Sequence, residues 1–502
     1  MTLHRVLVAN RGEIAIRVFR ACREAGIGTV AVYSDADADA PHTRVADRAV
    51  RIGPASPVHS YLNVEAILAA AQATGCDAIH PGYGFLSENA GFARACEAAG
   101  ITFIGPTAQT IEMMGSKIGA RRLMEAAGVP VVPGMTPRDQ SDAGVLAAVE
   151  AMGFPSLVKA SAGGGGKGMR ALRDGSGAAE MIAAARREAQ TAFGDGTLYV
   201  ERLVERPRHV EIQVFGDAHG NVLHLFEREC SIQRRHQKVI EESPSAALTP
   251  AVRAKMGDAA VSAARAAHYR NAGTIEFLLE GSGDDARFYF LEMNTRLQVE
   301  HPVTEAVVGV DLVHAQLAVA AGGRLPWAQH ELTQRGHAIE CRVYAEDPAS
   351  GFLPQAGRLL LYREPAGPGI RVDAGVIEGG EVPVTYDPLL AKLTVSAETR
   401  SATIDRAMTA LRNFPVLGIR TNIPFMIRLL DHPDFRSGAV HTGFIEQHLE
   451  ELTTPASPPP GALAAASRAG ATDQGVEEAS KGTPADGPRA SDPWASIAGW
   501  GR

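Results

Sequence analysis

The chain contains 502 residues, which is enough for two or three domains with buried cores. Apolar residues make up 45% and charged residues 21% of the chain, proportions typical of globular proteins. The formal net charge of −8 argues against non-specific binding to nucleic acid or to an anionic membrane surface, although a local basic cleft is compatible with it.

The five cysteines lie far apart in the chain and form no CxxC pair. This pattern indicates reduced thiols rather than a disulfide framework or a zinc site. The first residues show no cleavable signal, and nowhere do about eighteen apolar residues run together. We therefore expect a cytoplasmic protein that does not span a membrane.

The first part of the chain alternates apolar strand patterns with helical ones. Strands are expected at residues 5–10, 29–34, 77–82 and 101–106, and helices at 13–26, 64–75 and 89–100. This alternation predicts a parallel sheet that is covered by helices. The first turn has a single glycine and lacks the GxGxxG fingerprint, so the pattern disfavours nicotinamide binding.

Lysine is rare in this chain, because only seven of the 49 basic residues are lysine. A compact ammonium and a forked guanidinium bind anions differently, so each lysine is a candidate for a site that needs a point charge. Lys117 is one of them, in the first turn of a helix expected from Ser116 to about Ala127.

The segment LVKASAGGGGKGMRAL, Leu157 to Leu172, places four consecutive glycines between two lysines. Met169 follows Gly168 where a Walker motif needs lysine, and a strand follows where a dinucleotide-binding turn needs a helix. We therefore expect an antiparallel hairpin whose backbone N–H groups close over phosphates, with Lys159 at its base and Lys167 in the loop. A flexible surface turn is the alternative.

Three oxygen-bearing side chains are expected to converge in a later hairpin. Glu292 and Asn294 are two residues apart on a strand and project from one face. The preceding strand is joined to theirs by a GSGDD turn, which can bring Glu276 alongside. Two carboxylates and an amide oxygen suit Mg²⁺ or Mn²⁺ that bridges nucleotide phosphates.

Two neighbouring segments also carry polar side chains in a regular way. In RHVEIQV every second residue is polar, so one face of this strand is polar throughout. The segment ERECSIQRRHQKVIEESP is rich in hydrogen-bond donors but lacks the interleaved aromatic residues of a nucleic-acid site. A cleft for a small anion is the better interpretation.

The chain closely resembles the biotin carboxylase component of biotin-dependent carboxylases, which are ATP-grasp enzymes. The resemblance runs from Met1 to about Glu450 and is carried by VLVANRGEIAIR, HPGYGFLSEN, KASAGGGGKGMR, RHVEIQV, ERECSIQRRHQKVIEESP, EMNTRLQVEHPVTE and HAIECRVYAED. It implies an α/β and α+β protein with three-domain ATP-grasp architecture.

The resemblance also implies the domain limits. Residues 1–115 would form an N-terminal domain with a Rossmann-like parallel sheet, and residues 116–330 the ATP-grasp domain, including a mobile glycine-rich lid at about 131–203. Residues 331–450 would form a C-terminal α+β domain. Residues 451–502 are a Pro/Ala/Gly/Ser-rich tract without periodicity, expected to be a linker or disordered tail, in which the role of Trp494 and Trp500 stays open.

The implied activity is the ATP-dependent carboxylation of biotin with bicarbonate, through carboxyphosphate, as the first half-reaction of an acetyl-, propionyl- or methylcrotonyl-CoA-type carboxylase. The implied cofactors are ATP and Mg²⁺ or Mn²⁺ at two sites, with biotin as a carrier-bound substrate. A non-catalytic ATP-binding regulatory subunit and another ATP-grasp ligase are the alternatives.

The resemblance assigns site residues position by position. The ATP site would comprise Lys117, Lys159, Gly163, Gly164, Gly165, Gly166, Lys167, Gly168, Met169, Glu201, Leu203, His209, Gln233, His236 and Glu276. The metals would bind Glu276, Glu292 and Asn294. The bicarbonate pocket would comprise Lys238, Arg296, Gln298, Val299 and Glu300, with Glu300 as the base. Arg342 and Tyr83 would contact biotin, and the catalytic residues would be Glu300, Arg296, Lys238 and Arg342.

No AMKM-like biotinylation motif occurs in the sequence, so biotin is expected on another chain or on a missing C-terminal segment. The expected partners are a biotin carboxyl carrier protein or domain and a carboxyltransferase subunit, with a homodimer or larger complex, and neither nucleic acid nor a membrane. The sequence leaves open which acyl-CoA is carboxylated.

Overall fold

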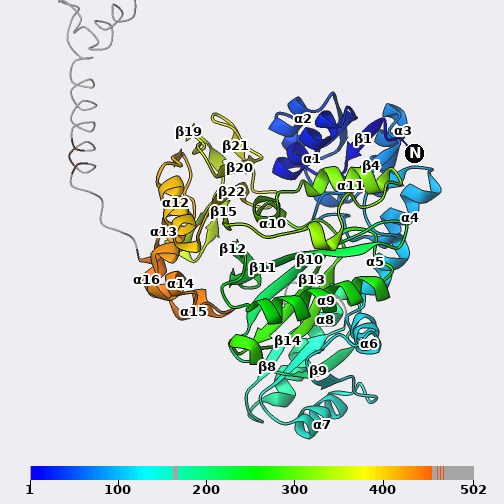
Figure 1. Ribbon diagram of the computed structural model, residues 1–502, viewed down its shortest axis with the longest axis vertical. Coiled ribbons are helices and arrows are strands. Elements are labelled where there is room, and N and C mark those ends of the chain that lie inside the picture. Colours follow the sequence, from blue (N-terminus) through cyan, green and yellow to red (C-terminus); the bar gives the residue numbers. More distant parts are fainter. Residues whose placement is uncertain (1, 162–167, 455–460, 462–463, 465–466, 468–502) are drawn as a thin grey trace, which may run out of the picture. The chain divides into compact units, whose positions relative to one another are not determined.

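The structure is a computed structural model that describes residues 2–161 and 168–454 and three later positions, 461, 464 and 467. The chain divides into two compact units, Met1–Thr453 and Thr454–Arg502 (Figure 1). Gly163 to Gly166, Lys167, Trp494 and Trp500 lie outside the described residues. Every strand that the described residues form belongs to the first unit.

A five-stranded parallel sheet opens the chain, as the alternating pattern predicts. Its strands are β1 (Arg5–Val8), β2 (Gly28–Ser34), β3 (Arg48–Gly53), β4 (Ala78–His80) and β5 (Thr102–Phe103), in the order β3-β2-β1-β4-β5. Among its helices are α1 (Gly12–Glu24), α3 (Val64–Thr74) and α4 (Ala90–Ala98). Val6, Leu7 and Val8 of β1 are all fully buried, because helices cover both faces of the sheet. The sequence patterns did not indicate β3, in which exposed arginines interrupt the apolar residues.

The glycine-rich segment belongs to a small four-stranded sheet, ordered β6 (Gly134–Met135), β9 (Leu198–Arg202), β7 (Ser156–Ala160) and β8 (Arg170–Leu172). It packs with α7 (Asp142–Met152) and α8 (Ala178–Phe193) around a separate hydrophobic core. β7 and β8 pair antiparallel, which confirms the predicted hairpin, although its tip lies outside the described residues. Gly168 has a φ of 69°, and a Cβ there would lie 2.9 Å from the Ala160 Cβ, so only glycine fits.

A larger antiparallel sheet of eight strands lies in the first unit (Figure 1). In order across the sheet, the strands are β14 (Arg287–Asn294), β13 (Asn271–Glu280), β10 (Arg208–Gly216), β11 (Val222–Arg234), β12 (Gln237–Ser243), β15 (His337–Tyr344), β22 (Leu389–Ala397) and β20 (Ile370–Ala374). The pairing of β12 with β15 carries the sheet across the domain limit expected near residue 330.

Helices pack on two parts of this sheet. α9 (Pro250–Ala266) packs on β10 and β11, and α12 (Arg400–Arg412) packs on β15 and β22. α6 (Lys117–Ala126) begins one residue after the expected Ser116, whose side chain caps it by accepting a hydrogen bond from the Gly119 N–H. α10 (His301–Val308) and α11 (Leu312–Ala320) also contact the sheet, whereas α5 (Ala108–Gly115) packs against α4 and α6.

Four helices end the first unit: α13 (Ile423–Asp431), α14 (Pro433–Ser437), α15 (Phe444–Gln447) and α16 (Leu449–Thr453). In the described part of the chain, no single helix is long and apolar enough to cross a membrane; α10 and α11 pass that test only together, with a bend of 99° between them. All five cysteines are buried and free.

Candidate active site

Carboxylates line up across three neighbouring strands of the eight-stranded sheet. Glu211 of β10 lies opposite Glu276 of β13, and Glu276 lies opposite Glu292 of β14. Glu276 therefore lies beside Glu292 in the hairpin that the GSGDD turn closes, as the sequence predicts, with a register shift between Glu276 and Phe277. Asn294, at the end of β14, donates its amide N–H to Glu276 Oε1 at 2.8 Å.

Lys238 of β12 reaches over this row, and its ammonium is shared by three carboxylates. Its Nζ lies 2.6 Å from Glu211, 2.9 Å from Glu276 and 2.5 Å from Glu300. Burial alone would lower the pKa of Lys238, but the surrounding acidic groups raise it well above its ordinary value. The ammonium therefore stays charged and is held at one point by groups from three parts of the chain.

Glu300 joins this cluster to Arg342. Glu300 directly precedes α10 and is buried, with Oε1 on Lys238 and Oε2 2.9 Å from Arg342 Nη2. Burial raises the pKa of the Glu300 carboxyl, but Lys238 and Arg342 outweigh it and hold this pKa well below the usual range. Glu300 is therefore an ionised carboxylate held between two cations.

The residues between Asn294 and Glu300 supply further polar groups. The Gln298 amide donates to Glu276 Oε1 at 3.0 Å. The Arg296 guanidinium donates to Glu88 Oε2 at 2.9 Å and to Asn294 Oδ1 at 3.1 Å. The Val299 carbonyl accepts from the Lys392 ammonium at 2.7 Å. This segment therefore lies next to the carboxylate row, as the expected bicarbonate pocket requires.

A cleft of about 530 Å³ opens onto this segment. Arg296, Val299 and Arg342 line it together with Tyr83 from the N-terminal part of the chain and Tyr386 from the C-terminal part. The Tyr83 hydroxyl donates a hydrogen bond to Glu13. The structure thus brings Arg296 and Val299, two of the residues expected to hold bicarbonate, and Tyr83 and Arg342, expected to contact biotin, to the walls of one cleft.

The expected phosphate lysines form a neighbouring group. Lys159 of β7 donates to Glu201 Oε2 at 3.1 Å, and Arg121 binds the other oxygen of Glu201 at 2.8 Å. Burial lowers the pKa of Lys159, but Tyr199 and Glu201 together raise it by more than burial lowers it, so the net shift is upward. Lys117 is affected in the opposite direction, because burial and the positive charge of Lys159 lower its pKa.

Two cations that approach each other in this way favour an anion between them. The negative charge of Glu292 also acts on Lys117 and raises its pKa, so the lysines are electrostatically coupled to the carboxylate row. An anionic polyphosphate would relieve the repulsion between Lys117 and Lys159.

The other residues expected at the ATP site lie on adjoining strands and turns. His209 of β10 has Nε2 3.1 Å from Glu276 Oε2; burial lowers the pKa of this imidazole, but Glu276 raises it more. Gln233 is buried and pairs with Lys238 across the β11–β12 hairpin. His236 is exposed in the turn of that hairpin. Met169 directly precedes β8, and Leu203 directly follows β9.

The donor set at Glu276, Glu292 and Asn294 fits a divalent cation. All three are oxygen donors, which Mg²⁺ and Mn²⁺ prefer. Burial, and then the negative charge of Glu276, raises the pKa of the Glu292 carboxyl. A cation between the two carboxylates would remove this repulsion, so the residues present are suited to a metal.

The sequence patterns missed several groups that complete the site. Arg228 of β11 is fully buried and donates to Glu211 and Gln298. Glu241 of β12 accepts from Arg342 Nε at 2.6 Å. Glu88 anchors Arg296 from the N-terminal part of the chain. The regular polar residues of β11 and β12 are the only sequence signal for Arg228 and Glu241. This pattern does not indicate which residue each of them contacts.

Cys230, next to Arg228, is also fully buried, and burial raises the pKa of its thiol well above the ordinary value. A thiol in this state is a poor nucleophile. Cys230 is therefore a small buried residue rather than a nucleophile.

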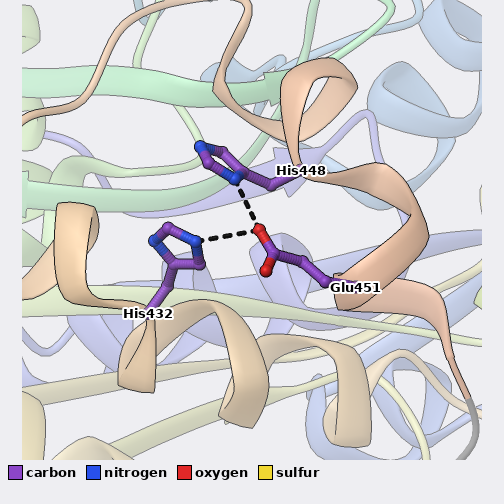
Figure 2. A group of neighbouring side chains, drawn as sticks. All are labelled: His432, His448 and Glu451. Carbon is purple, nitrogen blue, oxygen red and sulfur yellow. Dashed lines mark hydrogen bonds and ion pairs between the residues drawn. The ribbon is translucent and has the colours of Figure 1, made fainter.

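A separate group of side chains lies near the end of the first unit. Figure 2 shows that His432 and His448 both point at one oxygen of Glu451, at 2.9 Å and 2.5 Å. The Nδ1 atom of His432 accepts from the Asp434 N–H, so in the neutral imidazole Nε2 carries the proton and donates it to Glu451. A metal ion at that nitrogen would compete with this proton. The group is therefore best explained as a clamp that holds α16 against α13 and α14.

Lysines beside a glycine hairpin, a set of oxygen donors suited to a metal ion and a carboxylate held between cations together indicate an ATP-dependent ligase of the ATP-grasp class. Comparison with known proteins narrows this class. Residues 2–111 match the family model of the biotin carboxylase N-terminal domain, residues 116–328 that of the carbamoyl-phosphate synthase L chain ATP-binding domain, and residues 340–447 that of the biotin carboxylase C-terminal domain.

Two curated relatives and one solved structure illustrate the similarity. The chain is 51% identical over 451 residues to a biotin carboxylase of Halalkalibacterium halodurans, covering 89% of this chain and 98% of that protein. It is 51% identical over 458 residues to the mitochondrial methylcrotonoyl-CoA carboxylase subunit alpha of Arabidopsis thaliana, covering 91% of this chain but 62% of that subunit.

The solved structure is the biotin carboxylase domain dimer of the 2-oxoglutarate carboxylase of Hydrogenobacter thermophilus, in complex with MgADP, ADP and bicarbonate. It superposes with a TM-score of 0.87 at 46% identity and covers 91% of this chain and all of that domain. The chain therefore belongs to the biotin carboxylase family, which confirms the resemblance, and it is an ATP-dependent ligase.

Proposed function

We propose that this enzyme carboxylates biotin in two steps, with ATP and bicarbonate as co-substrates and carboxyphosphate as the intermediate. The observation that carries the proposal is the position of Glu300, which lies between Lys238 and Arg342. Arg342 lines the same cleft as Tyr83. Arg296 and Val299 line this cleft as well, so it can hold an inorganic anion and the ureido ring of biotin together.

In the first step bicarbonate would bind to Lys238, Arg296, the Gln298 amide and the Val299 N–H. Glu300 would take its proton, after which a bicarbonate oxygen attacks the γ-phosphorus of ATP and ADP leaves. Without substrate, Lys238 and Arg342 hold the pKa of Glu300 too low for an effective base. An anion that draws Lys238 away would raise this pKa, so binding of bicarbonate itself would activate the base.

In the second step the biotin ureido nitrogen attacks the carbonyl carbon of carboxyphosphate, the bond from that carbon to the phosphate oxygen breaks, and the leaving phosphate takes the ureido proton. Arg342 would stabilise the negative charge that develops on the ureido oxygen, and Tyr83 would lie against the ring. Glu241 supports this role, because it holds the Arg342 Nε at 2.6 Å and so fixes the direction of the guanidinium.

The nucleotide would bind beside this cleft. Lys117 and Lys159 would hold phosphates under the glycine hairpin with Gly163 to Gly166, Lys167 and Gly168. Met169, Glu201 and Leu203 would frame the adenine, and His209, Gln233 and His236 would contact the ribose or phosphates. Mg²⁺ or Mn²⁺ at Glu276, Glu292 and Asn294 would offset the negative charge of the phosphates.

The three-domain division and the partners belong to the same proposal. A lid at about 131–203 is supported by its own sheet and separate hydrophobic core. Biotin would arrive on a carrier protein or domain, a carboxyltransferase would use the product, and two copies of the chain would pair, as relatives are carboxylase subunits and a similar domain is a dimer. Five free, buried cysteines favour a cytoplasmic location.

The decisive measurement is bicarbonate-dependent release of ADP, with and without free biotin, together with the formation of acid-labile carboxybiotin from labelled bicarbonate. We expect slow ADP release without biotin, faster release with it, and carboxybiotin only when ATP and bicarbonate are both present. A non-catalytic ATP-binding subunit would release no ADP. An ATP-grasp ligase for other substrates would form no carboxybiotin.

A further inference from the structure

Arg228 of β11 has no solvent-exposed surface, yet every N–H group of its guanidinium has an acceptor. Nε donates to Glu211 Oε1 at 2.5 Å, Nη1 to Gln213 and Thr304, and Nη2 to Thr274 and Gln298. An arginine side chain has five N–H donors in a fixed planar fork, so this arrangement uses all of them. The guanidinium is therefore held in one orientation by strands β10 and β13, by helix α10 and by the segment that precedes this helix.

The first consequence concerns the direction of the Gln298 amide. Arg228 Nη2 donates to Gln298 Oε1 at 2.6 Å, and Gln298 Nε2 donates to Glu276 Oε1 at 3.0 Å. A flipped amide would place its oxygen against the Glu276 carboxylate and its NH₂ group against the guanidinium. Both contacts are repulsive, so Arg228 fixes the amide with its donor side toward the carboxylate row and leaves a second N–H for a bound anion.

The second consequence concerns Lys238. Glu211 is shared between Arg228, at Oε1, and the Lys238 ammonium, at Oε2 and 2.6 Å. Arg228 is also the third cation, after Lys238 and Arg342, whose charge lowers the pKa of Glu300. One buried arginine thus positions two groups that are proposed to bind bicarbonate: Gln298 by direct contact and Lys238 through Glu211.

We propose that Arg228 is a positioning residue for the bicarbonate half-reaction, acting through Gln298 and, by way of Glu211, through Lys238. This inference rests on the proposed function, since it concerns the same anion pocket. Lysine at position 228 would keep the charge and the ion pair with Glu211. The lysine ammonium, however, carries its three donors on a single nitrogen. It therefore cannot bind Gln298 and, at the same time, the acceptors that Arg228 Nη1 binds.

The test compares Arg228→Lys with the wild-type enzyme in steady-state ADP release. We expect the KM for bicarbonate to rise about ten-fold, the loss expected for one charge-assisted hydrogen bond, while kcat and the KM for ATP change less than about three-fold. Arg253→Lys is the matched control. Arg253 binds the fully buried Glu227 of the same strand and does not line the cleft, so its replacement should leave the KM for bicarbonate unchanged.

A double-mutant cycle separates this role from a merely structural one. Gln298→Ala should itself raise the KM for bicarbonate. Adding Arg228→Lys to it should raise that KM by less than about two-fold further, because lysine at this position keeps the ion pair with Glu211 and loses mainly the contact with Gln298. If the KM for bicarbonate of the double variant rose by the full product of the two single-variant increases, the proposal would be overturned. So would an unchanged KM for bicarbonate in Arg228→Lys.

Thr304→Val provides an independent variant, should Arg228→Lys fail to fold. It removes one acceptor from Arg228 Nη1 without removing a charge. The KM for bicarbonate should rise more than the KM for ATP, and an equal change in both would contradict a positioning role. If the wild-type enzyme itself shows no bicarbonate-dependent ADP release, the proposed function fails, which is a different outcome from failure of the Arg228 inference.

Discussion

Replacing Glu300 with glutamine tests the proposed base with little change in shape. Glu300 contacts Lys238 at 2.5 Å and Arg342 at 2.9 Å, and it is buried. The variant weakens both contacts, but Lys238 keeps Glu211 and Glu276, and Arg342 keeps Glu241. We therefore expect a cost of about 1–3 kcal/mol in the free energy of unfolding, which leaves a folded protein.

The effect on activity should be much larger, because an amide cannot accept the bicarbonate proton. A positioned general base contributes about 10²- to 10⁴-fold. We therefore expect bicarbonate-dependent ADP release by Glu300→Gln to fall at least about 100-fold, both with and without biotin. The assay measures ADP and carboxybiotin in parallel, and ADP binding serves as the test that the nucleotide site is intact.

Arg342→Ala is the comparison that separates the two steps. Arg342 is proposed to act on charge that develops on biotin, so its loss removes an interaction that does not exist when biotin is absent. This variant should keep slow, biotin-independent ADP release while losing carboxybiotin formation. Equal loss of both products in Arg342→Ala, or near wild-type ADP release in Glu300→Gln, would refute the assignment of these residues.

Three further predictions concern charge, pH and chain length. Lys238→Arg should lower kcat/KM for bicarbonate about ten- to a hundred-fold, because a forked guanidinium cannot occupy the point where three carboxylates meet; full activity would contradict this. Burial, and then the nearby charge of Glu241, raises the pKa of Glu340 from 4.5 to about 8. The stabilising effect of protonated Glu340 is therefore fully present below about pH 4.5 and is lost as the pH rises through about 8. Glu340→Gln should therefore flatten the decline in the free energy of unfolding between about pH 6 and 8, which urea titration measures. Deletion of residues 454–502 should leave the melting temperature and the turnover of free biotin unchanged, since the first unit closes at Thr453; a large fall in either would show that the tail contributes to the enzyme.

Much of the local structure follows from the sequence, because its signals lie within short stretches. The alternation of apolar strands and helices predicts the N-terminal parallel sheet, and the glycines between Lys159 and Met169 predict the hairpin of β7 and β8. The short turn between β13 and β14 makes these strands neighbours, but a register shift between Glu276 and Phe277, which no sequence pattern indicated, is what sets Glu276 opposite Glu292. The resemblance to the family then assigned roles to residues that no local pattern could explain.

Other parts of the site depend on which distant strands become neighbours. Glu241 and Arg342 are 101 residues apart and meet only because β12 pairs with β15, and Arg228 meets Gln298 across 70 residues. Alternation of polar residues shows that such a strand has a polar face, but every carboxylate on that face is an equally good partner for a cation. Burial in the folded chain removes this choice, since a charge withdrawn from water must pair with the group that packing places beside it. The sequence alone therefore determines the secondary structure and the chemical type of the site, whereas tertiary packing decides which cation holds which carboxylate and how strongly the pKa of each is shifted.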